Sequence, residues 1–170
     1  TGGAGMLGST LAHRLVRLGA RVKILDAMAP DYGGNAFNLA EIRDDIQFIH
    51  GDIRDGEALL PCAEGTDYVF NLAAQVSYTD SNADMLTDLD INCRGQINVL
   101  EACRLAGNRP KIIFASSRFV YGRTERNPVD EKHPLNCLSI YGIHKLTGEK
   151  YHRFYYERYG IPTVSLRISN

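Results

Sequence analysis

A tyrosine and a lysine stand four residues apart in the segment "YGIHK". If this segment is helical, Tyr141 and Lys145 lie on one face of the helix. A free tyrosine has a pKa of about 10 and is a poor base at neutral pH, but a neighbouring ammonium group stabilises its phenolate. The pair is therefore a candidate proton-transfer site. Taken alone, the same spacing also occurs on ordinary solvated helix faces.

A serine is predicted to reach the same site. Ser117 ends the apolar segment "KIIFASS", which reads as a strand of residues 111–117. Its hydroxyl can hydrogen-bond the oxygen of a substrate and share a proton with Tyr141. Ser116, one residue earlier, points to the other side of the strand. The alternative is that both serines only finish the strand.

Three glycines in the opening "TGGAGMLG" predict a phosphate-binding turn. Gly2 permits a tight turn, Gly5 allows the backbone to approach a diphosphate, and Gly8 allows the following helix to pack closely. Asp26, eighteen residues after Gly8, ends the next predicted strand. A carboxylate there accepts both hydroxyls of an adenosine ribose and repels a 2′-phosphate, which favours NAD over NADP. The glycines alone could also mark simple turns.

A second strand-end carboxylate follows. Asp52 closes the predicted strand 46–52 and can accept a hydrogen bond from an adenine amino group, with Ile53 against the ring. The alternative for Asp52 is a helix cap or a turn residue.

Predicted strands and helices alternate along the chain and position these residues. The length of 170 residues is that of one domain. Helical periodicity covers 6–18, 83–106 and 139–159, and short apolar strands cover 21–26, 46–52, 67–74, 111–117 and 163–168. This order predicts an α/β fold with a doubly wound parallel sheet of the Rossmann type and helices on both faces. Residues 27–44 and 122–138 are expected to be loops at the ligand-binding edge.

Composition narrows the class of protein. The net charge is −1 with no basic tract, so no nucleic-acid partner is expected, and no apolar run approaches the roughly 18 residues of a membrane span. The four cysteines form no C-x-x-C pair and no cluster with metal-ligand spacing. We therefore expect no metal site, and reduced thiols in a cytoplasmic protein.

The motifs together resemble a known family. They are "TGGAGMLGS", "ILD", "GDIRD", "NLAAQVS", "DINCRGQINVLEACR", "FASSRFVYG", "YGIHK" and "LRISN". In this order they are similar to the nucleotide-sugar epimerases and dehydratases of the extended short-chain dehydrogenase/reductase superfamily, of the UDP-glucose/galactose 4-epimerase type. The resemblance covers essentially the whole chain.

The resemblance implies a role for each site residue. The NAD diphosphate is assigned to the glycine turn, with Gly2, Gly5, Met6, Leu7 and Gly8. The adenosine ribose is assigned to Asp26, and the adenine to Asp52 and Ile53. Ala73 and Ala74 are assigned to the cofactor channel. Ser117 and Tyr141 would contact the reacting hydroxyl, with Tyr141 as base, and Lys145 would hold the nicotinamide ribose. Asn170 would contact the sugar-nucleotide diphosphate. Asn92 is interpreted as a helix-packing residue.

The resemblance also implies more chain than the 170 residues printed. Family members have a short strand before the glycine motif and a substrate-binding region after "LRISN". We therefore expect residues 1–170 to be the NAD-binding domain, with an unpaired slot between the strands "RVKIL" and "YVFNL". A homodimer through the two long helices is a further expectation.

Departures from the family pattern narrow the chemistry. Dehydratases carry an acidic pair directly after the catalytic Ser/Thr, where this chain has Arg118 and Phe119. This favours an NAD-dependent epimerase of a nucleoside-diphosphate sugar. The alternatives are a one-way dehydrogenase or reductase and a non-catalytic NAD-sensing protein. His144 replaces a commoner serine, and we interpret it as a packing or surface residue rather than a proton shuttle.

Overall fold

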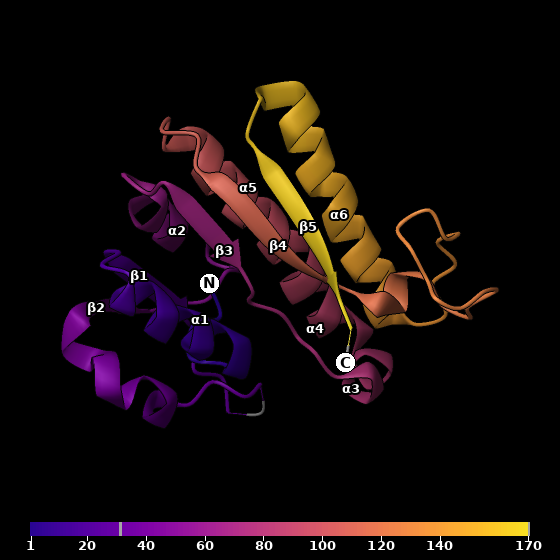
Figure 1. Cartoon of the computed structure of the whole chain (residues 1–170), viewed down its shortest axis with the longest axis horizontal. Coiled ribbons are helices and arrows are strands. Elements are labelled where there is room, and N and C mark those ends of the chain that lie inside the picture. The colour runs from indigo at the N-terminus through magenta and orange to yellow at the C-terminus, as the bar shows by residue number, and fades with distance from the viewer. Residues whose placement is uncertain (31, 170) are drawn as a thin grey trace.

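The fold is built from five parallel strands in two small sheets (Figure 1). The computed structural model describes residues 1–30 and 32–169. In the first sheet β1 (Val22–Asp26) pairs with β2 (Ile46–His50), and Asp26 lies opposite His50. In the second sheet β4 (Lys111–Ser117) lies between β3 (Tyr68–Asn71) and β5 (Thr163–Ile168). All pairs are parallel, so the carboxyl ends of neighbouring strands meet at one edge of each sheet.

Helices connect the strands. The α-helices are α1 (Met6–Arg17), α2 (Gly56–Ala63), α3 (Tyr78–Ala83), α4 (Met85–Leu89), α5 (Gly95–Leu105) and α6 (Ile140–Tyr159). A π-helical turn, η2 (Asp90–Arg94), joins α4 to α5, and two 3₁₀ helices occupy η1 (Ala36–Asp45) and η3 (Arg118–Val120). Figure 1 shows α5 and α6 side by side behind the second sheet.

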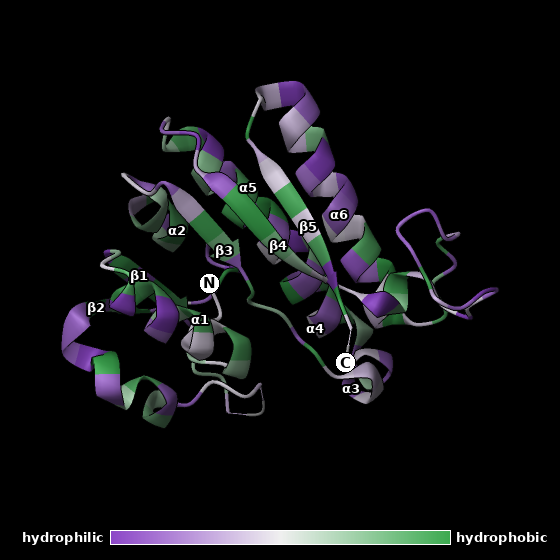
Figure 2. Ribbon diagram, viewed as in Figure 1, coloured by the Kyte–Doolittle hydropathy of each residue, from purple (hydrophilic) through white to green (hydrophobic). Residues whose placement is uncertain are grey.

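Two separate cores show that helices cover both sides of the first sheet. Ile24 and Leu25 are successive residues of β1, so their side chains point to opposite faces. Ile24 packs with Ala12 of α1 and Leu39 of η1. Leu25 belongs to the larger core, which takes most of its other buried members from α2, α5, α6 and β4. Figure 2 shows the corresponding hydrophobic residues along β3, β4 and α5. The predicted doubly wound α/β architecture is confirmed.

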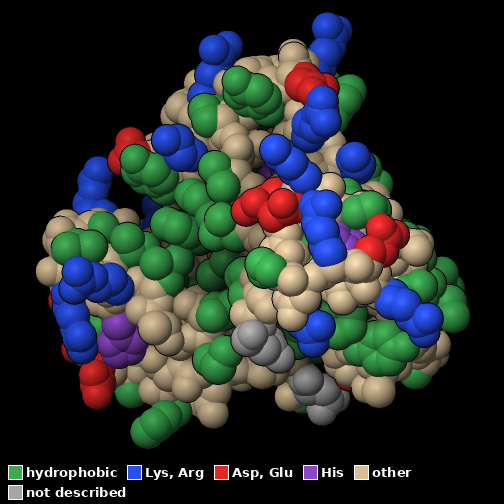
Figure 3. Space-filling view, turned by 45° about the vertical axis from the view of Figure 1, so that its right-hand side comes forward, with side chains coloured by type: hydrophobic (Ala, Val, Ile, Leu, Met, Phe, Trp, Pro, Cys, Tyr) green, Lys and Arg blue, Asp and Glu red, His purple; other side chains and the backbone are tan. Residues whose placement is uncertain are grey.

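An open groove separates β1 from β3, as the sequence led us to expect. It has a volume of about 890 Å³, and its lining includes Val22, Leu59, Tyr68 and Phe70. On the face shown in Figure 3, hydrophobic side chains gather where the molecule is hollowed. Main chain closes the end of the groove at the carboxyl edge.

Thr1 and Gly2 make that closure. The Thr1 amino group donates to the Phe70 carbonyl (2.9 Å), and the Gly2 N–H donates to the Leu25 carbonyl (2.9 Å). The Leu72 N–H in turn donates to the Thr1 carbonyl (3.3 Å). These bonds join the two sheets through the start of the glycine turn.

Several elements differ from those expected. Residues 36–45, expected to be loop, form η1, which begins where the Asn35 side chain accepts from the Phe37 N–H. The helices α2 and α3 were not predicted, because each is only a few residues long and shows little periodicity. The long helix 83–106 is present, but the π-helical turn interrupts it.

Helix α6 carries the Tyr–Lys pair and packs directly on β4. The Ser139 side chain caps its first turn by accepting from the Gly142 N–H (3.0 Å), and Gly160 ends it in the left-handed conformation. Gly148 lies against the Phe114 ring, so closely that a Cβ would sit 2.6 Å from Phe114 Cζ. His152, fully buried one turn later, stacks on the same ring with a 4.3 Å centroid separation.

The buried His152 makes stability depend on pH. Its Nδ1 donates to the Gly148 carbonyl (2.8 Å), and burial lowers its pKa from 6.5 to about 4. Between these values the unfolded chain binds a proton that the folded protein does not. The contribution of His152 to the free energy of unfolding is therefore fully present above about pH 6.5. It is lost as the pH falls toward 4, by about 3 kcal/mol in total.

We expect His152→Gln to remove this part of the pH dependence, whatever its cost at pH 7. Urea unfolding at pH 7 and pH 5 measures it in the wild type and the variant. The control is His50→Gln, which changes an exposed histidine and should leave the slope intact. An equally steep fall in stability in His152→Gln would contradict the assignment.

Candidate active site

The glycine turn is shaped to receive a phosphate group. Gly2 has φ +66°, and a Cβ there would lie 2.7 Å from the Ala73 nitrogen. Gly5 is different, because a Cβ would meet only the Gly2 carbonyl oxygen at 3.5 Å and otherwise open space. Gly5 caps α1 without a side-chain hydrogen bond, so the first N–H groups of the helix point toward this space.

The third glycine of the motif packs against the turn itself rather than the sheet. A Cβ on Gly8 would lie 2.2 Å from the Gly2 carbonyl oxygen. The close approach to the sheet is made instead by Gly3, where a Cβ would lie 2.4 Å from Ile24 Cγ2. Gly3 lies outside the G-x-x-G-x-x-G spacing, and only the adjacent pair Gly2–Gly3 marks it in the sequence.

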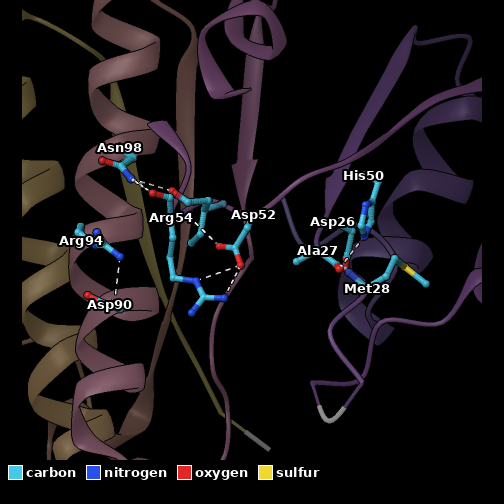
Figure 4. A network of polar contacts seen from close by, with 10 residues as sticks. Asp26, Ala27, Met28, His50, Asp52, Arg54, Asp90, Arg94 and Asn98 are labelled. Atoms are coloured by element: carbon cyan, nitrogen blue, oxygen red, sulfur yellow. Dashed lines mark hydrogen bonds and ion pairs between the residues drawn. The ribbon is translucent and has the colours of Figure 1, made fainter. Parts of the chain in front are cut away.

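Asp26 is held in place by two main-chain donors. Its Oδ2 accepts from the Ala4 N–H and its Oδ1 from the Met28 N–H, both at 2.9 Å. Figure 4 shows the carboxylate between Met28 and His50 at the end of β1. A carboxylate has about four acceptor positions, so two remain for the hydroxyls of a ribose.

Asp52 and Ile53 take different places. Asp52 pairs with Arg54, whose NH2 lies 2.6 Å from Asp52 Oδ2, and this hydrogen bond lowers the Asp52 pKa (Figure 4). Oδ1 accepts only from the Arg54 N–H (2.8 Å) and keeps capacity for an adenine amino group. The Ile53 side chain is 3% exposed and packs on Gly95 in the core. Burial therefore argues against the expected contact between this side chain and a purine ring.

The remaining residues assigned to a cofactor border the same turn. Met6 and Leu7, at the start of α1, are exposed although apolar. Ala73 and Ala74 follow β3, and the Ala73 N–H donates to the Thr1 hydroxyl (3.2 Å). Apolar side chains left uncovered beside a polar turn are typical of a ligand-binding surface.

Ser117 and Tyr141 are brought together at the carboxyl end of β4. Ser117 is buried, and its hydroxyl oxygen accepts from the Phe119 N–H at 3.3 Å. Tyr141 is 9% exposed and meets the Phe119 ring edge-on. Burial raises the pKa of Tyr141, whereas its hydrogen bond with Ser117 lowers it. The Ser116 hydroxyl donates to Glu149 of α6 instead (2.5 Å). Of the two serines, Ser117 is therefore the one next to Tyr141.

Lys145 is almost fully buried beside them. It is 3% exposed, and its Nζ donates to the Ala115 carbonyl (2.8 Å) and lies 5.8 Å from the Tyr141 ring centre. Burial lowers the pKa of Lys145 to about 8, against the opposing effect of Asp88. The spacing predicted that Lys145 lowers the Tyr141 pKa. In the structure that pKa is raised, because burial outweighs the hydrogen bond that opposes it.

A cavity of about 390 Å³ borders this group. It is lined by Tyr78, Arg118, Phe119, Gly122, Arg123, Leu138 and Ser139. None of the described residues that line it carries a carboxylate. The position that is acidic in dehydratases therefore presents an arginine here.

Two further expectations concern residues away from the reacting groups. Asn92 lies in the π-helical turn, and its Nδ2 donates to the Gln75 carbonyl (2.9 Å), as expected of a packing residue. Asn170 lies outside the described residues. Across residues 1–30 and 32–169, no three His, Cys, Asp or Glu side chains gather as a metal-ligand set, and no helix is long and apolar enough to cross a bilayer.

One buried pair of side chains close to the site has no signal in the sequence as a pair. Asp88 of α4 is fully buried and lies 2.5 Å from His144 Nδ1 of α6. The replacement of a commoner serine by His144 was visible in the sequence. Its partner, 56 residues away, was not.

These residues fit NAD. The turn around Gly5 leaves room for a diphosphate, Asp26 has free acceptor positions for a ribose, and Lys145 lies next to Tyr141 at the edge that both share. The ordered carboxylate of Asp26 is the feature that distinguishes NAD from NADP.

Comparisons with known proteins agree with this geometry. A putative UDP-glucose 4-epimerase from Methanocaldococcus jannaschii is 40% identical over the whole chain, which covers 54% of that protein. A D-erythronate dehydrogenase from Cupriavidus necator is 32% identical over 98% of the chain, which covers 55% of that protein. The chain thus spans about half the length of these relatives.

Solved structures and a family model give the same answer. The UDP-glucose 4-epimerase of Thermus thermophilus, in complex with NAD, superimposes with a TM-score of 0.87 at 33% identity, over 98% of this chain and 52% of that one. The model of the NAD dependent epimerase/dehydratase family matches residues 1–170. The chain therefore belongs to the NAD-dependent epimerase/dehydratase family.

Proposed function

We propose that the protein is an NAD-dependent epimerase of a nucleoside-diphosphate sugar. The carrying observation is the group of Ser117, Tyr141 and Lys145 at one strand end, beside a cavity without carboxylates. NAD supplies the hydride acceptor and donor. Elimination of water needs an additional acid–base pair, and Arg118 and Phe119 cannot provide it.

Ser117, Tyr141 and Lys145 have different roles in the proposed reaction. Ser117 holds the oxygen of the reacting sugar hydroxyl, and Tyr141 takes its proton as the ring carbon is oxidised. The keto-sugar then rotates in the site, so that its opposite face is reduced, and Tyr141 returns the proton to the same oxygen. The Lys145 ammonium stabilises the phenolate and binds a ribose hydroxyl, and exclusion of water strengthens both interactions.

The second candidate is a one-way dehydrogenase of the same family. One relative, 32% identical, is named as a dehydrogenase. The two reactions differ in their net consumption of NAD, because an epimerase regenerates NAD in each cycle and a dehydrogenase does not. Stoichiometric formation of NADH at 340 nm would identify the dehydrogenase.

We also propose a homodimer through the two long helices expected from the sequence, which are the helix of α4, η2 and α5 and the helix α6. Exposed apolar side chains on α4 and α6, among them Leu86, Leu89 and Phe154, support it. Light scattering of the whole protein should give twice the monomer mass. A monomeric mass at micromolar concentration would contradict it.

Tyr141→Phe tests the proposed reaction. It removes the ionisable oxygen and keeps the ring, so turnover of nucleotide sugars should fall by about 10²–10⁴-fold while NAD stays bound. The matched control is Tyr156→Phe, an exposed tyrosine of the same helix, which should retain full activity. Near-normal turnover by Tyr141→Phe would show that another group transfers the proton.

Asp26→Ala tests cofactor choice in the whole protein. Loss of the charge-assisted hydrogen bonds to the ribose should weaken NAD by about 10–100-fold and narrow its advantage over NADP. Asp52→Ala is the control, since the adenine is common to both cofactors and both should weaken alike. Calorimetric titration with each cofactor measures this. Tighter binding of NADP than NAD by the wild type would overturn the assignment.

A further inference from the structure

Two arginines line the cavity next to the reacting groups. Arg118 directly follows Ser117 in the sequence, and Arg123 follows Gly122. Both side chains are exposed, and the described lining of this cavity of about 390 Å³ contains no carboxylate. The ion pairs among the described residues include neither arginine. The cavity therefore carries two positive charges that favour an anionic ligand.

An aromatic ring connects Arg118 to the proposed base. The Arg118 guanidinium lies over the Phe119 ring, with its Cζ 4.9 Å from the ring centre. The same ring meets Tyr141 edge-on, at 5.8 Å between the ring centres. A guanidinium that stacks on a ring keeps its N–H groups free in its own plane, where they match the two oxygens of a carboxylate. The charge of Arg118 is therefore one aromatic ring away from Tyr141.

Packing fixes the segment that carries Arg123. Tyr121 is buried, and its hydroxyl accepts from Arg167 Nη1 (3.1 Å). Arg167 also donates two hydrogen bonds, of 2.9 and 2.8 Å, to Glu149 of α6. Gly122 has φ +66°, and a Cβ there would collide with a main-chain carbonyl from the far end of the same loop. Because this segment is tied to α6, the backbone holds Arg123 at the cavity before any ligand binds.

The other lining residues suit a sugar ring. Tyr78 stacks on Phe119 with a 5.9 Å separation of the ring centres, and Leu138 adds apolar surface. Ser139 accepts from the Gly142 N–H, so its own O–H remains able to donate to a ligand. Apolar and aromatic walls with a few polar groups are typical of sites for small ring-shaped ligands. A sugar that carries a carboxylate would use these walls and both arginines.

We propose that Arg118 and Arg123 bind a carboxylate on the sugar, so that the preferred substrate is a nucleoside-diphosphate uronic acid. This inference rests on the proposed function, which places the reacting sugar hydroxyl at Ser117 and Tyr141. The carboxylate takes no part in proton or hydride transfer, and its role is to orient the sugar ring. The competing source of negative charge is the diphosphate of the same substrate.

Binding to an inactive complex tests the carboxylate site. UDP-glucuronate and UDP-glucose are matched probes, because they differ only in a carboxylate in place of a hydroxymethyl group. Calorimetric titration of the whole Tyr141→Phe protein with bound NAD should show at least about 10-fold tighter binding of UDP-glucuronate. In this background Arg118→Gln or Arg123→Gln should remove most of that preference, and Arg118→Lys should keep more of it because the charge remains. Both arginines are exposed, so these substitutions should not impair folding.

The matched control is Arg126→Gln. Arg126 belongs to the same loop, but it pairs with Asp130 (2.7 Å) and is not among the lining residues. Its substitution should leave the preference for UDP-glucuronate unchanged. A loss of preference in Arg126→Gln as large as in Arg118→Gln would overturn the assignment, because it would trace the preference to the overall charge of the loop.

UDP alone separates the carboxylate from the diphosphate. If the arginines bound the diphosphate, Arg118→Gln would weaken UDP, UDP-glucose and UDP-glucuronate by the same factor, and the proposal would be wrong. Equal binding of the two sugar nucleotides before substitution would also overturn it, as would an unchanged preference in both Arg118→Gln and Arg123→Gln.

Turnover distinguishes this inference from the proposed function. If the inactive complex prefers UDP-glucuronate but the wild type epimerises neither sugar, the carboxylate site stands and the proposed function fails. If the wild type epimerises UDP-glucose with a kcat/KM equal to or above that for UDP-glucuronate, the proposed function stands and the carboxylate site is overturned.

Discussion

The close contact between α6 and β4 is the constraint on which the site depends. Gly148 lets the helix lie directly on the Phe114 ring, and Gly142 lets its first turn approach the Phe119 carbonyl, where a Cβ would sit 2.8 Å away. At this separation Lys145 reaches the Ala115 carbonyl, and Tyr141 reaches Ser117. A side chain at either glycine would push the helix outward, and both contacts would be lost together.

The same contact determines the electrostatics. Helix α6 lies so close to the sheet that Tyr141 and Lys145 are shielded from water. Burial favours the neutral form of each side chain, so it raises the pKa of Tyr141 and lowers the pKa of Lys145. In the reaction that we propose, a phenolate beside an ammonium must recover this energy from neighbouring charges and dipoles. The hydrogen bond with Ser117 lowers the pKa of Tyr141, whereas Asp88 raises the pKa of both Tyr141 and Lys145. The reacting pair is therefore not fully specified by its own spacing.

Local signals were readable in the sequence because each depends on a few neighbouring residues. The tight turn at Gly2, the strand-end position of Asp26 and the shared face of Tyr141 and Lys145 follow from backbone geometry and helical periodicity. The burial of Ile53 follows from its contact with Gly95, 42 residues away, and the Asp88–His144 pair joins separate helices. Such contacts arise from tertiary packing, which composition and periodicity do not encode.

The two halves of the site belong to different sheets. The glycine turn and Asp26 are attached to β1, whereas Ser117, Tyr141 and Lys145 are attached to β4 and α6. The bonds of Thr1 and Gly2 join them, together with the Thr1 hydroxyl, which donates to Asn71 in a buried network with Gln96 and His152. A ligand that touches the glycine turn and Lys145 at once contacts both groups of residues. Its binding energy adds directly to the stability of their arrangement, because it binds only the state in which both halves are in place.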